Sequence, residues 1–262
     1  MPKIDKIISF DISSDFGMFK KPDVNTPAYF TFNIIPKTQI LGILGAVIGL
    51  GGYSQMKESD NYPEFYRELQ DLLIGIVPYG NKGVYQKRLI KYNNTVGYAN
   101  KDGGTLNIIE QTLIEPKYKI YIGLDLSKES HQKLNEFLDE KVVQYEYIPY
   151  MGKNEFKLDI DEVKHFEDIQ EFTPNDEFAI FSLFPNIDNE ALKKSEALRD
   201  PFDSSMSESY FYYFERLPIE LDKLNQYQYE NFAYTNAKMI SNSEFVKKLT
   251  LFLIDEKIIC LY

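Results

Sequence analysis

The sequence is poor in the side chains on which most catalytic and metal sites are built. Its 262 residues include one cysteine, Cys260, two histidines, His131 and His165, and no tryptophan. A single cysteine excludes an internal disulfide framework and a zinc site built from several cysteines. Two histidines leave little for metal binding or for general acid–base catalysis. We therefore expect no cofactor and no bound metal, and the residues give no sign of an enzyme.

Long apolar runs are also missing. The longest, residues 40–53, has about 14 residues and contains five glycines, whereas a membrane-spanning helix needs about 20 apolar residues. The first twelve residues carry acids within their apolar stretch and have no small-residue cleavage site, which is not the pattern of a signal peptide. We therefore expect a cytoplasmic protein with no membrane partner.

Positive charge is scarce overall but is unevenly distributed. The 40 acidic and 29 basic residues give a net charge of −11, which argues against a protein that coats nucleic acid. Residues 1–123 carry 14 basic and 12 acidic side chains, a net of +2, so residues 124–262 carry 15 and 28, a net of −13. No acid occurs between Asp71 and Asp102, and this stretch contains Lys82, Lys87, Arg88, Lys91 and Lys101.

Tyrosines alternate with the cations of this acid-free stretch. They are Tyr79, Tyr85, Tyr92 and Tyr98. Basic groups neutralise phosphates, and aromatic rings stack on unpaired bases at roughly 1–3 kcal/mol each. The pattern is typical of a single-stranded nucleic-acid site. It also fits a solvated β-hairpin whose tyrosines pack on their own sheet, and the residues alone leave both interpretations open.

Hydrophobic periodicity predicts an α+β fold. The expected elements are strands 3–12, 29–35, 117–126 and 156–163, helices 38–49, 64–74 and 128–140, and paired strands 83–98 and 105–114. The order of the strongest elements, β–α–β–β–α–β, suggests a ferredoxin-like unit interrupted by the tyrosine-rich hairpin. Strands expected at 178–184, 210–217, 249–254 and 257–261 suggest a smaller, mostly-β C-terminal subdomain. We therefore divide the chain into residues 1–170 and 171–262.

Three glycines lie at helical spacing within the first predicted helix. They are Gly42, Gly45 and Gly49. Glycine inside a helix costs about 1 kcal/mol relative to alanine, so the stripe predicts that something approaches this helix closely. A sheet, a protein partner and a nucleic-acid backbone are the candidates.

Several short motifs, taken in order, resemble a known family. They are IISFDI (7–12), FKKPDVN (19–25), IPKTQILGILGA (35–46), IEPKY (114–118), PYMGKNEF (149–156) and YFERLP (213–218). Their order along most of the chain is similar to that of CRISPR-associated protein family five. Members are RAMP-type subunits of the type I Cascade surveillance complex, and the sequence looks closest to type I-B.

The resemblance implies a fold and a role. The fold would be a ferredoxin-like (RRM-like) palm with an inserted β-hairpin thumb, here at about residues 76–112. Such a subunit holds the 5′ handle of the CRISPR RNA and caps the filament of backbone RAMP subunits in antiviral defence. It also contacts the large subunit of Cascade and, indirectly, target DNA. The implied thumb coincides with the acid-free stretch.

The predicted RNA contacts follow from the resemblance and the charge pattern together. Phosphates would be held by Lys20, Lys21, Lys37, Lys82, Lys87, Arg88, Lys91 and Lys153. Bases would stack on Tyr85 or Tyr92, as suits a single-stranded handle. The glycine stripe would let the helix approach a sheet or the RNA.

Two rival functions are retained. In the type I-C branch the family member is itself a metal-independent endoribonuclease with a Tyr, Lys and His group. Tyr29 and Lys37 lie near the helix start where part of such a site would fall, but no histidine occurs in the first 130 residues. We therefore expect a non-catalytic subunit. The second rival is a protein-only assembly scaffold that does not bind RNA.

Overall fold

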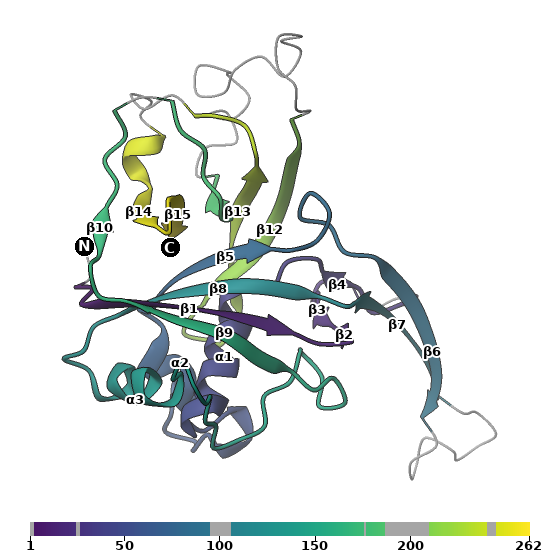
Figure 1. The fold of residues 1–262 in the computed structure, drawn as a ribbon. Helices are drawn as coiled ribbons and strands as arrows, with labels where there is room; N and C mark the ends of the chain where they lie inside the picture. Colours follow the sequence, from purple (N-terminus) through teal and green to yellow (C-terminus); the bar gives the residue numbers. More distant parts are fainter. Residues whose placement is uncertain (1–2, 25–26, 95–105, 176, 187–209, 240–244) are drawn as a thin grey trace.

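The computed structural model describes residues 3–24, 27–94, 106–175, 177–186, 210–239 and 245–262. Within these ranges the protein is a mixed α/β structure with many strands and few helices (Figure 1). No helix in the described part of the chain is long and apolar enough to cross a membrane.

A four-stranded antiparallel sheet forms the centre of the molecule. Its strands, in spatial order, are β5 (Leu73–Pro78), β8 (Lys117–Leu124), β1 (Lys6–Ser13) and β9 (Asp159–Phe166). Helices α1 (Lys37–Ile48) and α3 (Glu129–Phe137) connect these strands in the predicted strand–helix–strand–strand–helix–strand order. Both helices lie on one side of the sheet (Figure 1).

The alternating apolar side chains of β1 explain why this strand lies in the interior of the sheet. Ile8, Phe10 and Ile12 belong to the main hydrophobic cluster, which forms the side of the sheet that the helices cover. Successive strand residues point to opposite faces, so Ile7 joins a second cluster instead, together with Phe252 and Ile259. The sheet is therefore packed on both faces over part of its length.

One predicted helix is too long. The expectation of a helix over 64–74 is wrong beyond residue 69, because α2 spans Glu64–Leu69 and β5 begins at Leu73. The apolar spacing of Leu69 and Leu72 continues the helical pattern into the turn, and both side chains are fully buried. The following Leu-Ile-Gly-Ile-Val-Pro segment pairs with β8.

A long hairpin leaves the sheet between β5 and β8. It consists of β6 (Lys87–Asn94) and β7 (Leu106–Ile114), paired from Lys87↔Leu113 to Asn94↔Leu106. Figure 1 shows it extending away from the rest of the molecule. Three two-residue strands lie near its base: β2 (Phe16–Gly17), β3 (Phe19–Lys20) and β4 (Thr31–Phe32). Within the strand predicted over residues 29–35, only Thr31 and Phe32 form a strand, β4.

The C-terminal part adds two three-stranded sheets. One contains β10 (Gln170–Glu171), β14 (Thr250–Ile254) and β15 (Lys257–Leu261), and the other contains β11 (Phe184–Pro185), β12 (Tyr212–Leu221) and β13 (Tyr227–Thr235). Short 3₁₀ turns occur at Tyr53–Gln55 and Val246–Lys248. The main cluster includes Leu183, Leu217, Leu221 and Phe232, so the two predicted parts of the chain share one core.

Candidate nucleic-acid interface

Strand alternation divides the cations of β6 between two faces of the hairpin. Lys87 and Lys91 point to one face and Arg88 points to the other, because successive residues of a strand alternate. All three are exposed. Lys82 lies just before the strand, exposed at a tight turn where its φ of 54° is in the left-handed region. Lys101 and Tyr98 lie outside the described residues.

The first face gains a third cation, Lys21, from the residue that directly follows β3. Lys21 Nζ lies 3.8 Å from Glu215 Oε1 of β12. Lys87 is close to the same carboxylate: partial desolvation lowers the Lys87 pKa, Lys21 lowers it further, and Glu215 opposes both. Two lysines that repel each other are thus held beside one carboxylate, which leaves a positive surface facing outward.

Glu215 is fixed by several donors. Its side chain is only 9% exposed. It accepts hydrogen bonds from the backbone N–H groups of Asn33 (3.0 Å) and Ile34 (2.9 Å) and from the Tyr213 hydroxyl (2.8 Å). The carboxylate therefore has a fixed position, and it pairs with Lys21 beside the hairpin while attracting Lys87 from beyond ion-pair distance.

Asn33 joins the hairpin base to the core. Its side-chain Nδ2 donates to the Gly83 carbonyl at 2.7 Å, and its Oδ1 accepts from the Tyr85 N–H at 2.9 Å. The Tyr118 hydroxyl donates to the Asn33 carbonyl at 2.6 Å. Neither Asn33 nor Glu215 was among the predicted site residues. Glu215 lies within the 213–218 motif and Asn33 lies in none of the motifs, and nothing in the sequence indicates that they meet.

The second face of the hairpin contacts the loop at residues 149–156. Lys153 Nζ lies 2.6 Å from Glu110 Oε2 and 2.7 Å from Glu155 Oε1, and 5.1 Å from the centre of the Tyr92 ring. The Tyr92 hydroxyl donates to Glu110 Oε1 at 3.0 Å. Lys153 and Tyr92, both predicted to touch RNA, are therefore engaged with each other and with Glu110, although Tyr92 stays partly exposed.

Lys20 also belongs to this second side. Its Nζ lies 3.7 Å above the Tyr29 ring. Tyr29 pairs with Glu110 along the outer edge of β7, so its ring is on the Glu110 face. Five of the predicted cations have no carboxylate within ion-pair distance among the described residues. They are Lys20, Lys82, Lys87, Arg88 and Lys91.

Two of the predicted contacts, Tyr85 and Lys37, have buried side chains. Tyr85 packs on Tyr118 with ring centres 5.1 Å apart, and its hydroxyl donates to the Lys117 carbonyl, so its ring cannot stack on a base. Lys37 is buried, and its Nζ donates to the backbone oxygen of Tyr262 at 3.1 Å. Burial lowers the Lys37 pKa to about 8, and Glu220 opposes the shift. Lys37 is not available to a phosphate.

The glycine stripe has a different neighbour from those expected. A Cβ on Gly45 would lie 2.4 Å from Phe65 Cβ, so the close approach is to α2 rather than to a sheet or RNA. Gly49 caps the C-terminus of α1 with φ 80°, the usual role of glycine at this position. Gly42 has only the end of the Phe65 ring nearby, at 3.9 Å.

The histidines are packed at other places. His131 is buried on α3, where its Nδ1 accepts the Asp125 N–H at 3.0 Å, and His165 Nε2 lies 2.6 Å from the Leu138 carbonyl. Burial lowers the His131 pKa to about 4. The described residues contain no group of three or more His, Cys, Asp or Glu side chains that could hold a metal ion.

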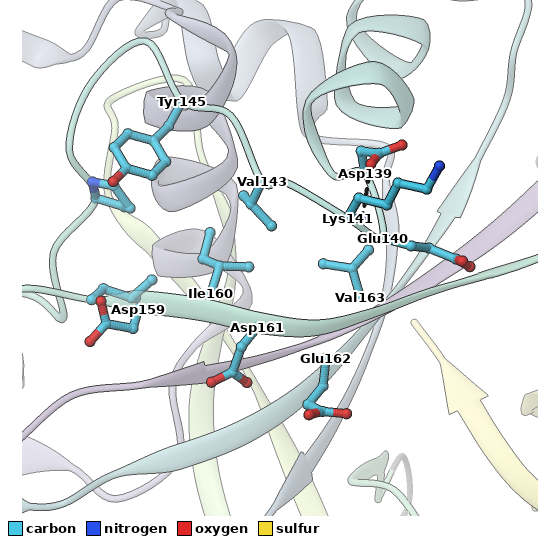
Figure 2. A pocket seen from close by; sticks show the side chains of 12 residues that line it. Asp139, Glu140, Lys141, Val143, Tyr145, Asp159, Ile160, Asp161, Glu162 and Val163 are labelled. Atoms are coloured by element: carbon cyan, nitrogen blue, oxygen red, sulfur yellow. Dashed lines mark hydrogen bonds between the residues drawn. The ribbon is translucent and has the colours of Figure 1, made fainter.

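A hollow of about 390 Å³ lies beside the free edge of β9 and is rich in acids. Figure 2 shows that Val143, Ile160 and Val163 point toward its middle, whereas Asp161 and Glu162 point away from them, beyond β9. Asp139 is used by its own turn, where it accepts the Lys141 N–H at 2.9 Å. The carboxylates therefore do not converge on one point.

No family model and no curated protein matches this chain. Among solved structures, a CRISPR protein from Archaeoglobus fulgidus is 12% identical, covers 97% of this chain and 98% of its own, and has a TM-score of 0.49. A chain of a CRISPR RNA-guided surveillance complex is 9% identical over 90% of this chain and 91% of its own, with a TM-score of 0.46. A chain of a type III-B Cmr-beta complex bound to target RNA is 11% identical over 97% and 86%, with a TM-score of 0.39. At 9–12% identity, the function must be inferred from the chain's own residues.

Proposed function

We propose that this protein is a non-catalytic, RNA-binding subunit of a CRISPR effector complex. It would correspond to family five of a type I Cascade, closest to type I-B, and act in the cytoplasm. In this proposal the central sheet with α1 and α3 is the ferredoxin-like palm, and the β6–β7 hairpin is the thumb. The thumb base binds the 5′ handle of the CRISPR RNA, while other surfaces meet the backbone subunit and the large subunit.

One observation carries the proposal. The cations Lys82, Lys87, Arg88 and Lys91 lie on or just before the first strand of a projecting hairpin, Lys20 lies beside it over the Tyr29 ring, and none of the five forms an ion pair with a carboxylate among the described residues. The chain as a whole carries 40 acids against 29 bases, so a cluster of unpaired cations is a local exception to its average. Phosphates are the natural counter-ions for such a cluster, and a hairpin only two strands wide suits a short single strand.

The division of the hairpin into two faces sharpens the binding mode. On the first face, Lys21 and Lys87 lie beside the fixed carboxylate of Glu215, and Lys91 lies further along the same face of β6. On the second, Lys153 is neutralised by Glu110 and Glu155. We therefore assign the main phosphate contacts to the first face. Arg88 and the exposed edge of Tyr92 would reach a strand that passes around the hairpin.

Three placements support a non-catalytic role. His131 is buried in α3 with its Nδ1 occupied, His165 contacts the Leu138 carbonyl, and Lys37 is buried against Tyr262. A Tyr, Lys and His group for metal-independent cleavage therefore does not assemble at the hairpin base. Incubating the protein with labelled repeat RNA in EDTA tests this part, because specific cutting would overturn it.

RNA binding is tested by salt titration of the protein co-purified with its backbone subunit. The affinity for handle RNA should fall as salt rises, and the slope of log affinity against log salt should shrink by about 0.7 for each phosphate contact removed. Lys21→Ala, Lys87→Ala and Lys91→Ala should each show this loss. Lys223→Ala, on the exposed β12–β13 turn, is the matched control. Slopes equal to that of the control in all three variants would leave the protein-only scaffold as the better explanation.

A further inference from the structure

The outer side of β9 is a free edge of the central sheet. β9 is the last strand in the sheet order, and among the described residues no strand pairs with the side that faces away from β1. The His165 N–H donates to the exposed carboxylate of Glu140 at 3.1 Å instead of to a neighbouring strand. Over residues 159–163, no described segment other than β1 bonds to the backbone. Free N–H and C=O groups along a sheet edge pair with another extended strand.

One side of this edge is hollow and apolar. The hollow of about 390 Å³ lies between β9 and residues 139–149. Val143, Ile160 and Val163 point toward its middle (Figure 2). Val142 and Tyr145, on the segment that faces β9, are 64% and 48% exposed. Apolar side chains on this side of an added strand would therefore leave water and pack against apolar groups.

The other side of the edge is acidic. Asp161 and Glu162 point away from the hollow, beyond β9 (Figure 2), and both are exposed. Neither forms an ion pair with another described side chain. The lining of the hollow contains one base, Lys141, and five acids: Asp139, Glu140, Asp159, Asp161 and Glu162. This edge would repel a nucleic-acid backbone and attract basic side chains.

We propose that the free edge of β9 binds an extended segment of another protein in which lysine or arginine alternates with apolar residues. The segment adds a strand to the central sheet, so main-chain hydrogen bonds hold it. Successive residues of a strand point to opposite faces, so its apolar side chains enter the hollow and its basic ones lie beside Asp161 and Glu162. Acids on a sheet edge also discourage pairing with strands of other composition. The proposal uses only β9 and residues 139–149, so it stands apart from the RNA site on the hairpin.

Peptide binding to the full chain, followed by fluorescence anisotropy, tests the proposal. The probe is a labelled peptide of sequence Lys-Val-Lys-Val-Lys-Val-Lys with blocked ends, which when extended is about as long as β9. We expect it to bind. Peptides with glutamate in place of lysine, or with serine in place of valine, should bind at least about tenfold more weakly. A peptide of the same composition with its lysines and valines in two blocks should also bind at least about tenfold more weakly, because it cannot present one kind of side chain to each face.

Backbone methylation separates strand addition from charge attraction. In an extended peptide the N–H groups of the lysines point to one edge and those of the valines to the other. Methylating one set should weaken binding by about tenfold or more, and methylating the other set should change it little. Asp161→Asn and Glu162→Gln should each lower the affinity about two- to fivefold. Glu58→Gln is the matched control, because Glu58 is exposed and does not line the hollow.

Several outcomes would overturn the proposal. They are no binding of the alternating peptide, equal binding of the block peptide, and equal effects of the two methylations. Asp161→Asn and Glu162→Gln proteins that both bind the peptide as Glu58→Gln does would also overturn it. The salt dependence of RNA binding is measured separately on the hairpin variants. Failure of the RNA role therefore leaves the β9 result standing, and failure at β9 leaves the RNA role standing.

Discussion

Lys153 Nζ lies 2.6 Å from Glu110 Oε2, and this contact fastens the hairpin to the body of the protein. Glu110 is a nearly buried residue of β7, and the Tyr92 hydroxyl of β6 donates to its other oxygen. Lys153 comes from the loop that precedes β9. One carboxylate therefore joins both strands of the hairpin to a third segment, and Lys153, which the sequence predicts to bind RNA, holds the hairpin in place.

Removing Lys153 should cost stability more than RNA affinity. Lys153→Ala leaves Glu110 without its cation in a largely buried site, which we expect to lower the free energy of unfolding by about 1–3 kcal/mol. Lys157→Ala is the control, because its pair with Asp159 is well exposed on both sides and such pairs contribute about 0–1 kcal/mol. Urea unfolding of the two variants gives the comparison. A Lys153→Ala protein of unchanged stability that binds RNA more weakly than Lys87→Ala would contradict this assignment.

Asn33 should be among the most sensitive polar residues of the structure. Asn33→Ala removes two buried hydrogen bonds, to the Gly83 carbonyl and from the Tyr85 N–H, and leaves both backbone groups unpaired. We expect a loss of about 2–4 kcal/mol in the free energy of unfolding. Gln132→Ala, which removes an exposed 2.8 Å bond to the Leu126 carbonyl, should cost less than about 1 kcal/mol. If both variants unfolded at the same denaturant midpoint and with the same slope, the two Asn33 hydrogen bonds would contribute no more to stability than the exposed Gln132 bond.

The hairpin and its exposed cations could be predicted from sequence because both are local properties. A stretch without acids, with tyrosines and turn residues, forms paired strands, and lysines at its surface remain solvated. What could not be predicted is which tyrosine is buried. Tyr85 and Tyr92 occur in similar local sequences, but Tyr85 packs on Tyr118 of β8 and Tyr92 does not. That difference depends on a strand that follows them by more than twenty residues.

Lys37 shows the same limit over a longer range. Its place at the start of α1 follows from Pro36 and the helical pattern, but its burial depends on Tyr262, at the other end of the sequence. Strand β13 was missed for a related reason. Tyr227 and Tyr229 alternate with polar residues, but the consecutive Glu230 and Asn231 break that alternation before Phe232, and the partners that bury the strand are supplied by β11 and β12. A local pattern does not identify the surface against which a segment packs.

The two glycines of α1 should respond oppositely to alanine. Gly45→Ala places a methyl group 2.4 Å from Phe65 Cβ, which forces the helices apart and should cost about 1–3 kcal/mol. Gly42→Ala meets nothing closer than 3.9 Å and should stabilise α1 by up to about 1 kcal/mol. Thermal melts of the two variants against the wild type measure the difference. Similar melting temperatures would mean that α1 and α2 do not pack as described.

His131 should lower the free energy of unfolding at mildly acidic pH. Burial holds its pKa at about 4 in the folded protein against an ordinary 6.5, so between these values the unfolded chain binds more protons than the folded one. Stability should therefore be fully retained above pH 6.5 and fall as the pH drops toward 4, by roughly 2 kcal/mol from this residue.

The matched variant for this effect is His131→Asn. The Asn Oδ1 can replace the Nδ1 that accepts the Asp125 N–H, while carrying no titrating group. Carboxylates elsewhere also titrate in this range, so the informative quantity is the difference between wild type and variant in urea unfolding at pH 7 and pH 4.5. The free energy of unfolding of His131→Asn, relative to that of the wild type, should rise as the pH falls, because the variant need not release a proton in order to fold. Parallel curves would show that His131 is protonated as readily in the folded protein as in the unfolded chain.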